Sequence, residues 1–169
     1  MYSDDSKIVQ FQKYSIQRKE SLEFMNEPTP RKEKITSPQK QDQDLTPDWV
    51  DYTILIAEDE ETNFLYLKTA LSPTNINIIR AKNGKEAVEQ MRVNPLINII
   101  LMDIKMPEMN GLEATRGIKS FRKDVPIIAQ TAFAMEEDRR NCSAVGCDDF
   151  LAKPIRYKVL IETISKFLK

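Results

Sequence analysis

The chain reads IILMDIKMPEMNG from Ile99 to Gly111, and this stretch decides the fold. An unbroken apolar run ends at Asp103, and Pro107 and Gly111 follow soon after it. An apolar run bounded by turn residues is typical of a strand that is buried on both faces of a parallel sheet. Asp103 is therefore predicted at the carboxyl end of a central strand, where open α/β sheets bind ligands. Taken alone, the aspartate is better explained as a loop residue that hydrogen-bonds nearby backbone, so the other strand ends have to be considered.

On both sides of this stretch, apolar runs alternate with segments of helical spacing. The predicted strands cover residues 53–57, 76–80, 98–102, 126–131 and 149–152. The predicted helices cover residues 64–71, 85–93, 112–120, 135–145 and a last segment around 159–167. Asn83 and Gly84 are predicted to form a turn, and Gly146 to cap the C-terminus of the helix at 135–145. Strands that alternate with helices pair in parallel through right-handed crossovers. The sequence therefore predicts an α/β fold, in which helices cover both faces of a doubly wound, five-stranded parallel sheet.

Most of the predicted strand ends carry chemically distinct groups. In chain order these groups are Glu58 and Asp59, then Asp103, then Thr131, then Lys153. The remaining strand ends in Arg80 and Ala81, to which we assign no role. The carboxyl ends of parallel strands share one edge of a sheet. We therefore expect the groups at the ends of the other four strands to meet at that edge. Each has an ordinary structural explanation alone, but their joint occurrence on one edge favours a site.

The chemistry of this predicted site is that of phosphate and a hard cation. Three carboxylates repel one another unless a cation neutralises them, and oxygen ligands without His or Cys favour Mg²⁺. A carboxylate can also attack phosphorus to form an aspartyl phosphate, with a lysine and a divalent ion stabilising the transferred charge. The chain contains no histidine. This excludes a Ser-His or Cys-His nucleophile, a His-ligated zinc site and a phosphohistidine donor within the chain.

The bulk properties of the chain add few constraints. A net charge of -1 gives no general attraction to nucleic acid or to an anionic membrane. No apolar segment approaches the ~20 residues that span a bilayer, and the amino terminus lacks the pattern of a secretory signal. We therefore expect a cytoplasmic protein without nucleic-acid or membrane contacts. Cys142 and Cys147 are expected to be reduced and partly buried.

The first 50 residues differ in composition from the rest of the chain. They mix charges of both signs with Gln, Ser, Thr and Pro, which predicts a polar N-terminal extension or linker, largely disordered. A short helix is possible between Lys7 and Met25. Trp49 and Val50 are expected to pack against the folded domain, which we assign to residues 51–169, although Trp49 could instead bind a partner.

Several separated motifs resemble the receiver domain of two-component response regulators. They are ILIAED at 54–59, LMDIKMPEMNG at 101–111, QTA at 130–132 and LAKP at 151–154. The resemblance extends from about Tyr52 to the end of the chain. It implies a flavodoxin-like (βα)5 fold with strand order 2-1-3-4-5. It also implies a phosphorelay function, in which a histidine kinase or a histidine phosphotransfer protein donates a phosphoryl group to Asp103.

The resemblance also implies roles for individual residues. Glu58, Asp59 and Asp103 would hold Mg²⁺ together with the backbone carbonyl of Lys105, and Glu58 would act through water, since the family often has Asp there. Lys153, whose peptide bond to Pro154 the family tends to hold cis, would bind the phosphoryl group. The switch residues would be Thr131 and Phe150. Phe150 lacks the hydroxyl of the Tyr that the family often has at that position.

Such a domain is a signalling module and not an enzyme beyond weak self-catalysed phosphotransfer and autodephosphorylation. Phosphorylation would change the surface of the helix at 135–145, the strand at 149–152 and the last helix, a face through which a homodimer is possible. The module would be a stand-alone regulator or part of a hybrid histidine kinase.

The sequence leaves three alternative functions to compare with a phosphorelay receiver. A phosphatase of the haloacid dehalogenase type needs a second Asp where this chain has Lys105. A flavodoxin-like cofactor protein needs a phosphate-binding first loop, but this loop is acidic from Glu58 to Glu61. The third alternative is a docking module that works without phosphorylation.

Overall fold

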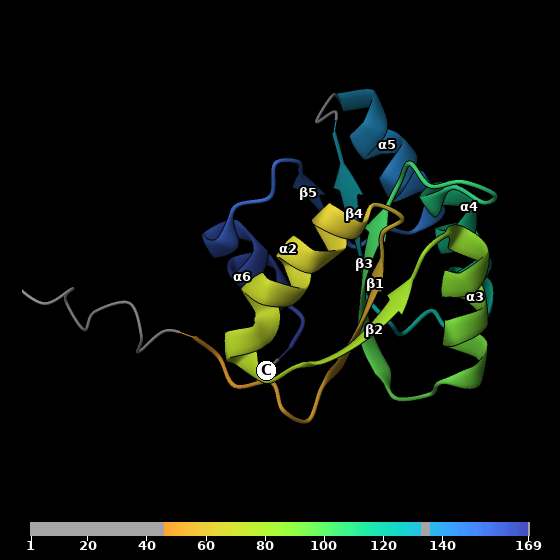
Figure 1. Ribbon diagram of the computed structural model, residues 1–169. Helices are drawn as coiled ribbons and strands as arrows, with labels where there is room; N and C mark the ends of the chain where they lie inside the picture. The colour runs from red at the N-terminus through yellow and green to blue at the C-terminus, as the bar shows by residue number, and fades with distance from the viewer. Residues whose placement is uncertain (1–45, 133–135, 169) are drawn as a thin grey trace, which may run out of the picture. The chain divides into compact units, whose positions relative to one another are not determined.

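The computed structural model describes residues 46–132 and 136–168. The short helix and the disorder predicted for the N-terminal extension lie outside these residues. The described part contains a five-stranded parallel sheet in the order β2-β1-β3-β4-β5, which confirms the predicted fold (Figure 1). The strands are β1 (Thr53–Ala57), β2 (Asn77–Ala81), β3 (Ile97–Asp103), β4 (Ile127–Thr131) and β5 (Asp149–Ala152).

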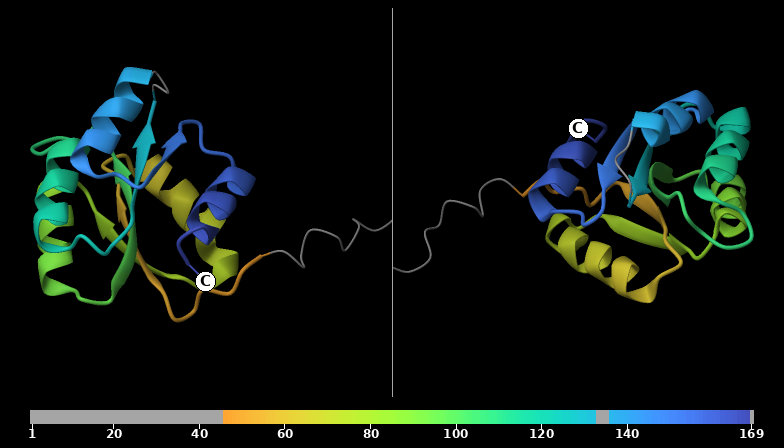
Figure 2. Two further views of the ribbon diagram at one scale, coloured as in Figure 1. Left: turned by 180° about the vertical axis from the view of Figure 1, so that it is seen from behind. Right: turned by 90° about the horizontal axis from the view of Figure 1, so that it is seen from above.

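Helices cover both faces of the sheet, as the views in Figure 2 show. One face carries α2 (Glu61–Leu71) and α6 (Tyr157–Ser165), and the other carries α3 (Gly84–Val93), α4 (Gly111–Phe121) and α5 (Glu136–Val145). A short 3₁₀ turn, η2 (Ser72–Thr74), follows α2. Each of the five helices predicted after residue 60 is present, and the observed bounds differ from the predicted ones by a few residues.

The central strand β3 explains why the sheet is so strongly specified. Its side chains alternate between the two faces, because successive residues of a strand point in opposite directions. Ile99 and Leu101 pack in the cluster beneath α2 and α6, whereas Ile100 and Met102 pack in the cluster beneath α3 and α4. All four are fully buried. The uninterrupted apolar run is therefore the signature of a strand with two covered faces.

Local polar groups set the helix boundaries near the site. Asn110 forms a capping box with Glu113 at the start of α4, which satisfies backbone N–H groups that the first turn leaves free. We expected a turn at Asn83 and Gly84, but Asn83 is the N-cap of α3 and accepts a hydrogen bond from the backbone N–H of Glu86. Gly146, expected as a C-terminal cap of α5, has a φ of 98°, which glycine adopts readily.

Trp49 marks the start of the packed region. Its side chain is 2 % exposed and belongs to the cluster beneath α2 and α6, and its backbone N–H donates to the carbonyl of Thr74 over 2.6 Å. This confirms the predicted packing of Trp49. The same expectation was wrong for Val50, which is exposed.

Cys142 and Cys147 are not joined to each other in a disulfide, and the first is buried and the second half-buried. Burial, reinforced by the neighbouring Cys142, raises the pKa of the Cys147 thiol to about 12.

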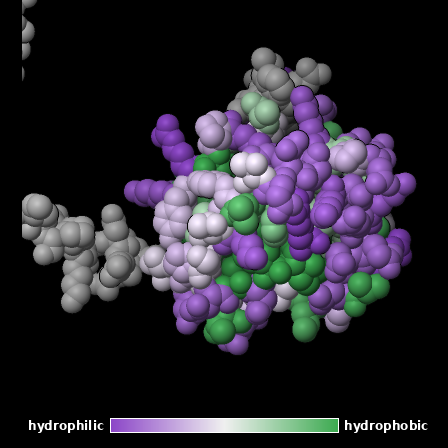
Figure 3. Space-filling model, in the orientation of Figure 1, coloured by the Kyte–Doolittle hydropathy of each residue, from purple (hydrophilic) through white to green (hydrophobic). Residues whose placement is uncertain are grey.

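None of the helices described is long and apolar enough to cross a membrane. Figure 3 shows a mainly hydrophilic face with apolar side chains near its middle, and α2 exposes Leu65 and Tyr66.

Candidate functional site

The site is built where β1 and β3 end. These strands are neighbours, and Ala57 is paired with Met102, so the residues that follow, Glu58 and Asp103, lie side by side. Asp59 continues the chain on the β1 side. Carboxylate oxygens of Glu58, Asp59 and Asp103 lie within 4.8 Å of one another. The structure therefore brings together the three acids that the sequence placed at this edge.

Glu58 is buried completely, yet its carboxylate is well satisfied. One oxygen, Oε1, accepts a hydrogen bond from Asn63 Nδ2 at 3.1 Å, and the other, Oε2, accepts from Lys153 Nζ at 2.8 Å. A buried carboxylate without such partners would be costly. The first turn of α2 and the end of β5 thus cooperate to keep an acid inside the fold.

Asp103 is held from two sides. Its Oδ1 accepts a hydrogen bond from the backbone N–H of Lys105 at 3.0 Å, and its Oδ2 accepts from Lys153 Nζ at 2.5 Å. The side chain is only slightly exposed. This arrangement fixes the orientation of the carboxylate at the rim of the sheet.

Lys153 links the two acids across the sheet. Its backbone N–H donates to the carbonyl of Thr131, which ties the end of β5 to the end of β4, and its peptide bond to Pro154 is cis as expected. Burial disfavours its ammonium, but the carboxylates of Asp103 and Glu58 outweigh that effect and raise the pKa of Lys153. The lysine is therefore a permanent cation at neutral pH.

The remaining residues named from the sequence occupy the same edge or border it. Thr131 is the last residue of β4 and is buried. Phe150 lies in β5 and is half-buried, with the guanidinium of Arg139 over its ring at 4.1 Å from the centroid. Lys105 follows β3 and is exposed. The role of its carbonyl as a metal ligand stays a prediction.

Arg80 belongs to the site surroundings, although we assigned it no role from the sequence. Its guanidinium donates to the backbone carbonyls of Glu58 and Asp59 at 3.2 to 3.4 Å, pairs with the carboxylate of Glu61, and covers the ring of Phe64 at 4.3 Å. The strand order could have predicted the position of Arg80, because β2 is the neighbour of β1. The end of β2 must then lie beside the acids that follow β1.

The loop after β3 is packed tightly against the site. A Cβ added to Gly111 would lie 2.1 Å from the carbonyl oxygen of Asp103, so only glycine fits there without movement of the backbone. Glu108 has a φ of 63°, and its carboxylate accepts hydrogen bonds from Asn83 and Lys85 of the α3 region. These contacts anchor the loop that carries Lys105.

The residues present fit a hard divalent cation. The three clustered carboxylates carry three negative charges, and the single ammonium of Lys153 offsets one of them. The cluster is therefore able to hold a metal ion, and its all-oxygen donor set is the type that Mg²⁺ prefers.

Comparison with known proteins agrees with this geometry. Residues 54–165 match the family profile described as the response regulator receiver domain. The chain belongs to this family. One relative is the polar-differentiation response regulator DivK of Brucella anthropi, which is 36% identical over 118 residues, covering 69% of this chain and 95% of the relative.

Solved receiver domains share the fold. A chain from the co-crystal structure of the Saccharomyces cerevisiae histidine phosphotransfer protein Ypd1 with the receiver domain of Ssk1 aligns with a TM-score of 0.67 and 30% identity, covering 73% of this chain and 90% of that chain. The receiver domain of the sensor histidine kinase PA1611 from Pseudomonas aeruginosa, solved with a magnesium ion in its active site cleft, aligns with a TM-score of 0.64 and 32% identity, covering 69% and 96%. This chain is thus a receiver domain of a signalling protein.

Proposed function

We propose that Asp103 of this receiver domain accepts a phosphoryl group from a phosphohistidine of a histidine kinase or a histidine phosphotransfer protein. The observation that carries the proposal is the carboxylate of Asp103, held by Lys153 at 2.5 Å inside a cluster of three acids. An Asp103 oxygen bonds to phosphorus, the P–N bond to the donor breaks, and the released imidazole takes up a proton. The related Ssk1 receiver, crystallised with Ypd1, supports a donor of this kind.

Mg²⁺ is the cation for which this site is suited. Asp59 and Asp103 would bind it directly, with the carbonyl of Lys105 as a further ligand. Both oxygens of Glu58 already accept hydrogen bonds, from Asn63 and Lys153, so Glu58 would act through water. When bound, the ion offsets the negative charge that builds up on the phosphoryl oxygens. The magnesium-bound PA1611 receiver supports this assignment.

The response to phosphorylation would start at Thr131 and Lys153, which engage the new phosphoryl oxygens. Movement of Thr131 would leave room for Phe150 to turn inward, and its ring would then leave the guanidinium of Arg139. This rearrangement changes the face formed by α5, β5 and α6, through which partners or a second copy would bind. Phosphorylation thus biases a two-state element.

The domain needs no separate catalytic subunit for this cycle. Its own residues would support slow phosphotransfer from small donors and slow autodephosphorylation. We place the domain in the cytoplasm, as a stand-alone regulator or as part of a hybrid kinase.

The proposal is tested by intact-mass measurement after incubation with acetyl phosphate and Mg²⁺. We expect the wild-type protein to gain one phosphoryl group and Asp103→Asn to gain none. Asp124→Asn is the matched control, since Asp124 is an exposed partner of Arg122. A gain that persists in Asp103→Asn would contradict the assignment, and an unmodified wild-type protein would favour a docking module that works without phosphorylation.

A further inference from the structure

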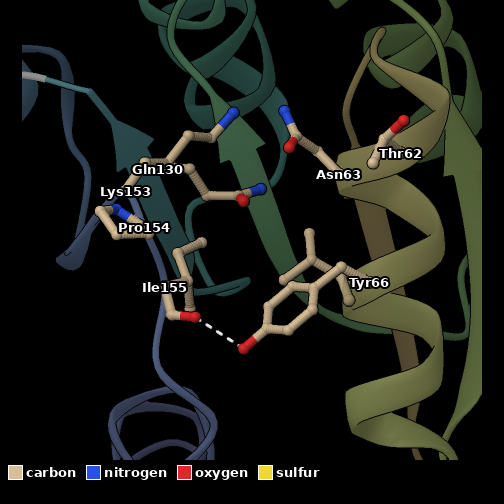
Figure 4. A pocket seen from close by; sticks show the side chains of 8 residues that line it. Thr62, Asn63, Tyr66, Gln130, Lys153, Pro154 and Ile155 are labelled. Atoms are coloured by element: carbon tan, nitrogen blue, oxygen red, sulfur yellow. Dashed lines mark hydrogen bonds between the residues drawn. The ribbon is translucent and has the colours of Figure 1, made fainter. Parts of the chain in front are cut away.

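The segment that carries Lys153 is held in place by a hydrogen bond from a distant helix. It covers residues 153–156, between the end of β5 and the start of α6. The hydroxyl of Tyr66 on α2 donates to the carbonyl of Ile155 over 2.6 Å, and Figure 4 shows this bond crossing from the helix to the segment. The side chain of Ile155 also packs against the cluster beneath α2 and α6. Both the backbone and the side chain of this residue therefore anchor the segment.

The same helix also holds the ammonium of Lys153. Asn63 lies three positions before Tyr66, and residues with that spacing are neighbours on a helix surface. Asn63 Nδ2 donates to Oε1 of Glu58, and Oε2 of Glu58 accepts from Lys153 Nζ. Figure 4 shows the side chains of Asn63 and Lys153 pointing toward one another. Helix α2 thus fixes the lysine at two points, the ammonium through Asn63 and Glu58 and the backbone through Tyr66.

A pocket of about 630 Å³ lies between α2 and this segment. Its walls are formed on the helix side by Asn63, Tyr66 and Leu67 and on the segment side by Pro154 and Ile155. Because side chains do not fill this space, close packing does not set the spacing of the two elements across it. The hydrogen bond from Tyr66 crosses the space and carries that task. We therefore expect the segment to shift when the hydroxyl is removed.

Phosphorylation of Asp103 requires an accurate position for Lys153. In the unmodified protein Lys153 Nζ lies 2.5 Å from Oδ2 of Asp103. A phosphoryl group on Asp103 would take over this contact, so the ammonium has to meet the phosphoryl oxygens from nearly the same place. Lysine has a flexible four-carbon stem, and the placement of its charge depends on where its backbone is fixed. Misplacing a catalytic group by about 1 Å can slow a reaction by roughly 100-fold.

We propose that Tyr66 is a positioning residue for the phosphorylation of Asp103, acting through the carbonyl of Ile155 on the backbone that carries Lys153. Its hydroxyl is bonded to a backbone carbonyl and not to an acid of the site, so it orients the lysine and takes no part in the bond changes. This inference rests on the proposed phosphorylation of Asp103.

The test is the initial rate at which acetyl phosphate and Mg²⁺ label the full chain, measured by intact mass in the wild type and in Tyr66→Phe. Phenylalanine keeps the ring and removes only the hydroxyl. We expect labelling of the variant to be about threefold to tenfold slower, the effect of one lost hydrogen bond. Tyr157→Phe is the matched control, because Tyr157 is also an exposed tyrosine, at the start of α6. It should be labelled at the wild-type rate.

Two further measurements separate positioning from a general loss of stability. Urea denaturation should show that both variants are folded under the labelling conditions, so unfolding does not account for a slower rate. NMR should show the signals of the Ile155 carbonyl carbon and of the Lys153 side chain shifted in Tyr66→Phe. The signals of the Lys153 side chain should be unchanged in Tyr157→Phe.

The outcomes distinguish this inference from the proposed function. Labelling of Tyr66→Phe at the wild-type rate would overturn the positioning role and leave the phosphorylation of Asp103 intact. A slower rate with unshifted Lys153 signals would contradict the route through Ile155. A wild-type protein that acquires no label would instead overturn the proposed function, and the positioning role with it.

Discussion

At the scale of single residues, the site depends on how one ammonium is shared. Lys153 donates to Glu58 and Asp103 at once, so it satisfies a buried acid that would otherwise be costly and orients an acid at the rim. The two contacts serve different purposes. The bond to Glu58 keeps the fold intact, and the bond to Asp103 is the one that a transferred phosphoryl group would replace.

The first prediction concerns the pKa of Lys153, which the carboxylates of Asp103 and Glu58 raise against the effect of burial. We expect Asp103→Asn to lower this pKa, because one of the two carboxylates is lost. In the wild type the ammonium's contribution to the free energy of unfolding is complete at neutral pH. It is lost only as the pH rises through the raised pKa, above 10.5.

An NMR titration of the Lys153 side chain measures this pKa directly. Lys158, an exposed residue paired with Glu162 on α6, is the internal control, and its side-chain signals at neutral pH should be the same in the two proteins. A Lys153 pKa that does not change in Asp103→Asn would show that the 2.5 Å contact does not exist in solution.

The second prediction concerns Arg80, whose guanidinium binds two carbonyls next to the acids. Arg80→Lys should weaken Mg²⁺ binding roughly tenfold, because a lysine cannot reproduce the fork of donors that orients the ligand-bearing loop. Calorimetric titration with MgCl₂ measures the effect. Arg92→Lys is the control, since Arg92 also covers an aromatic ring, that of Phe121, but lies on α3. Equal loss of affinity in both variants would refute a specific role for Arg80.

Most residues of the candidate site could be predicted because each ends a strand or follows one directly in the sequence. Glu58, Asp103 and Lys153 are of this kind, and parallel strands bring their carboxyl ends to one edge. Arg80 could not be recognised in the same way. The contacts of Arg80 depend on which strand neighbours β1.

At the scale of elements, the loop between β3 and α4 connects the acid at the strand end to the helix that follows. Gly111 donates its backbone N–H to Ile104 and lies against the carbonyl of Asp103. Gly111→Ala should destabilise the fold by about 1–3 kcal/mol, because the added Cβ would lie 2.1 Å from that oxygen and displace backbone. It should also lower the rate of phosphorylation, since Asp103 moves with the loop.

Gly117→Ala is the matched control for this prediction. Gly117 is inside α4, and an added Cβ would approach only Val88, at 3.6 Å, so alanine should raise the free energy of unfolding by about 0.5–1 kcal/mol. Urea denaturation of both variants gives the comparison. If Gly111→Ala were as stable as the wild type, the close approach to Asp103 would be wrong.

The elements themselves were predictable where one physical signal dominated. The apolar run of β3 predicted a strand with two covered faces, and Gly146 ends α5 with a positive φ. The pair Asn83 and Gly84 was misjudged as a turn, because an asparagine before a glycine is typical of turns as well as of helix caps. Only the hydrogen bond from Glu86 distinguishes the two.

At the scale of the whole molecule, we propose that the folded domain begins just before Trp49. A fragment of residues 46–169 should keep the thermal stability of the full chain, whereas a fragment of residues 52–169 should lose about 3–5 kcal/mol with the buried indole. Trp49→Ala in the full chain should show a similar loss, measured by urea denaturation. Equal stability of the two fragments would place the boundary after Trp49.

The central claim is that Asp103 accepts phosphorus with the help of a divalent cation, and locating the phosphoryl group tests it most directly. Borohydride reduces an aspartyl phosphate to homoserine, which tandem mass spectrometry can assign to one position after proteolysis. After treatment with acetyl phosphate and Mg²⁺, the account predicts homoserine at position 103, and none when the metal is removed with EDTA. Homoserine at another position, or equal labelling without Mg²⁺, would contradict it.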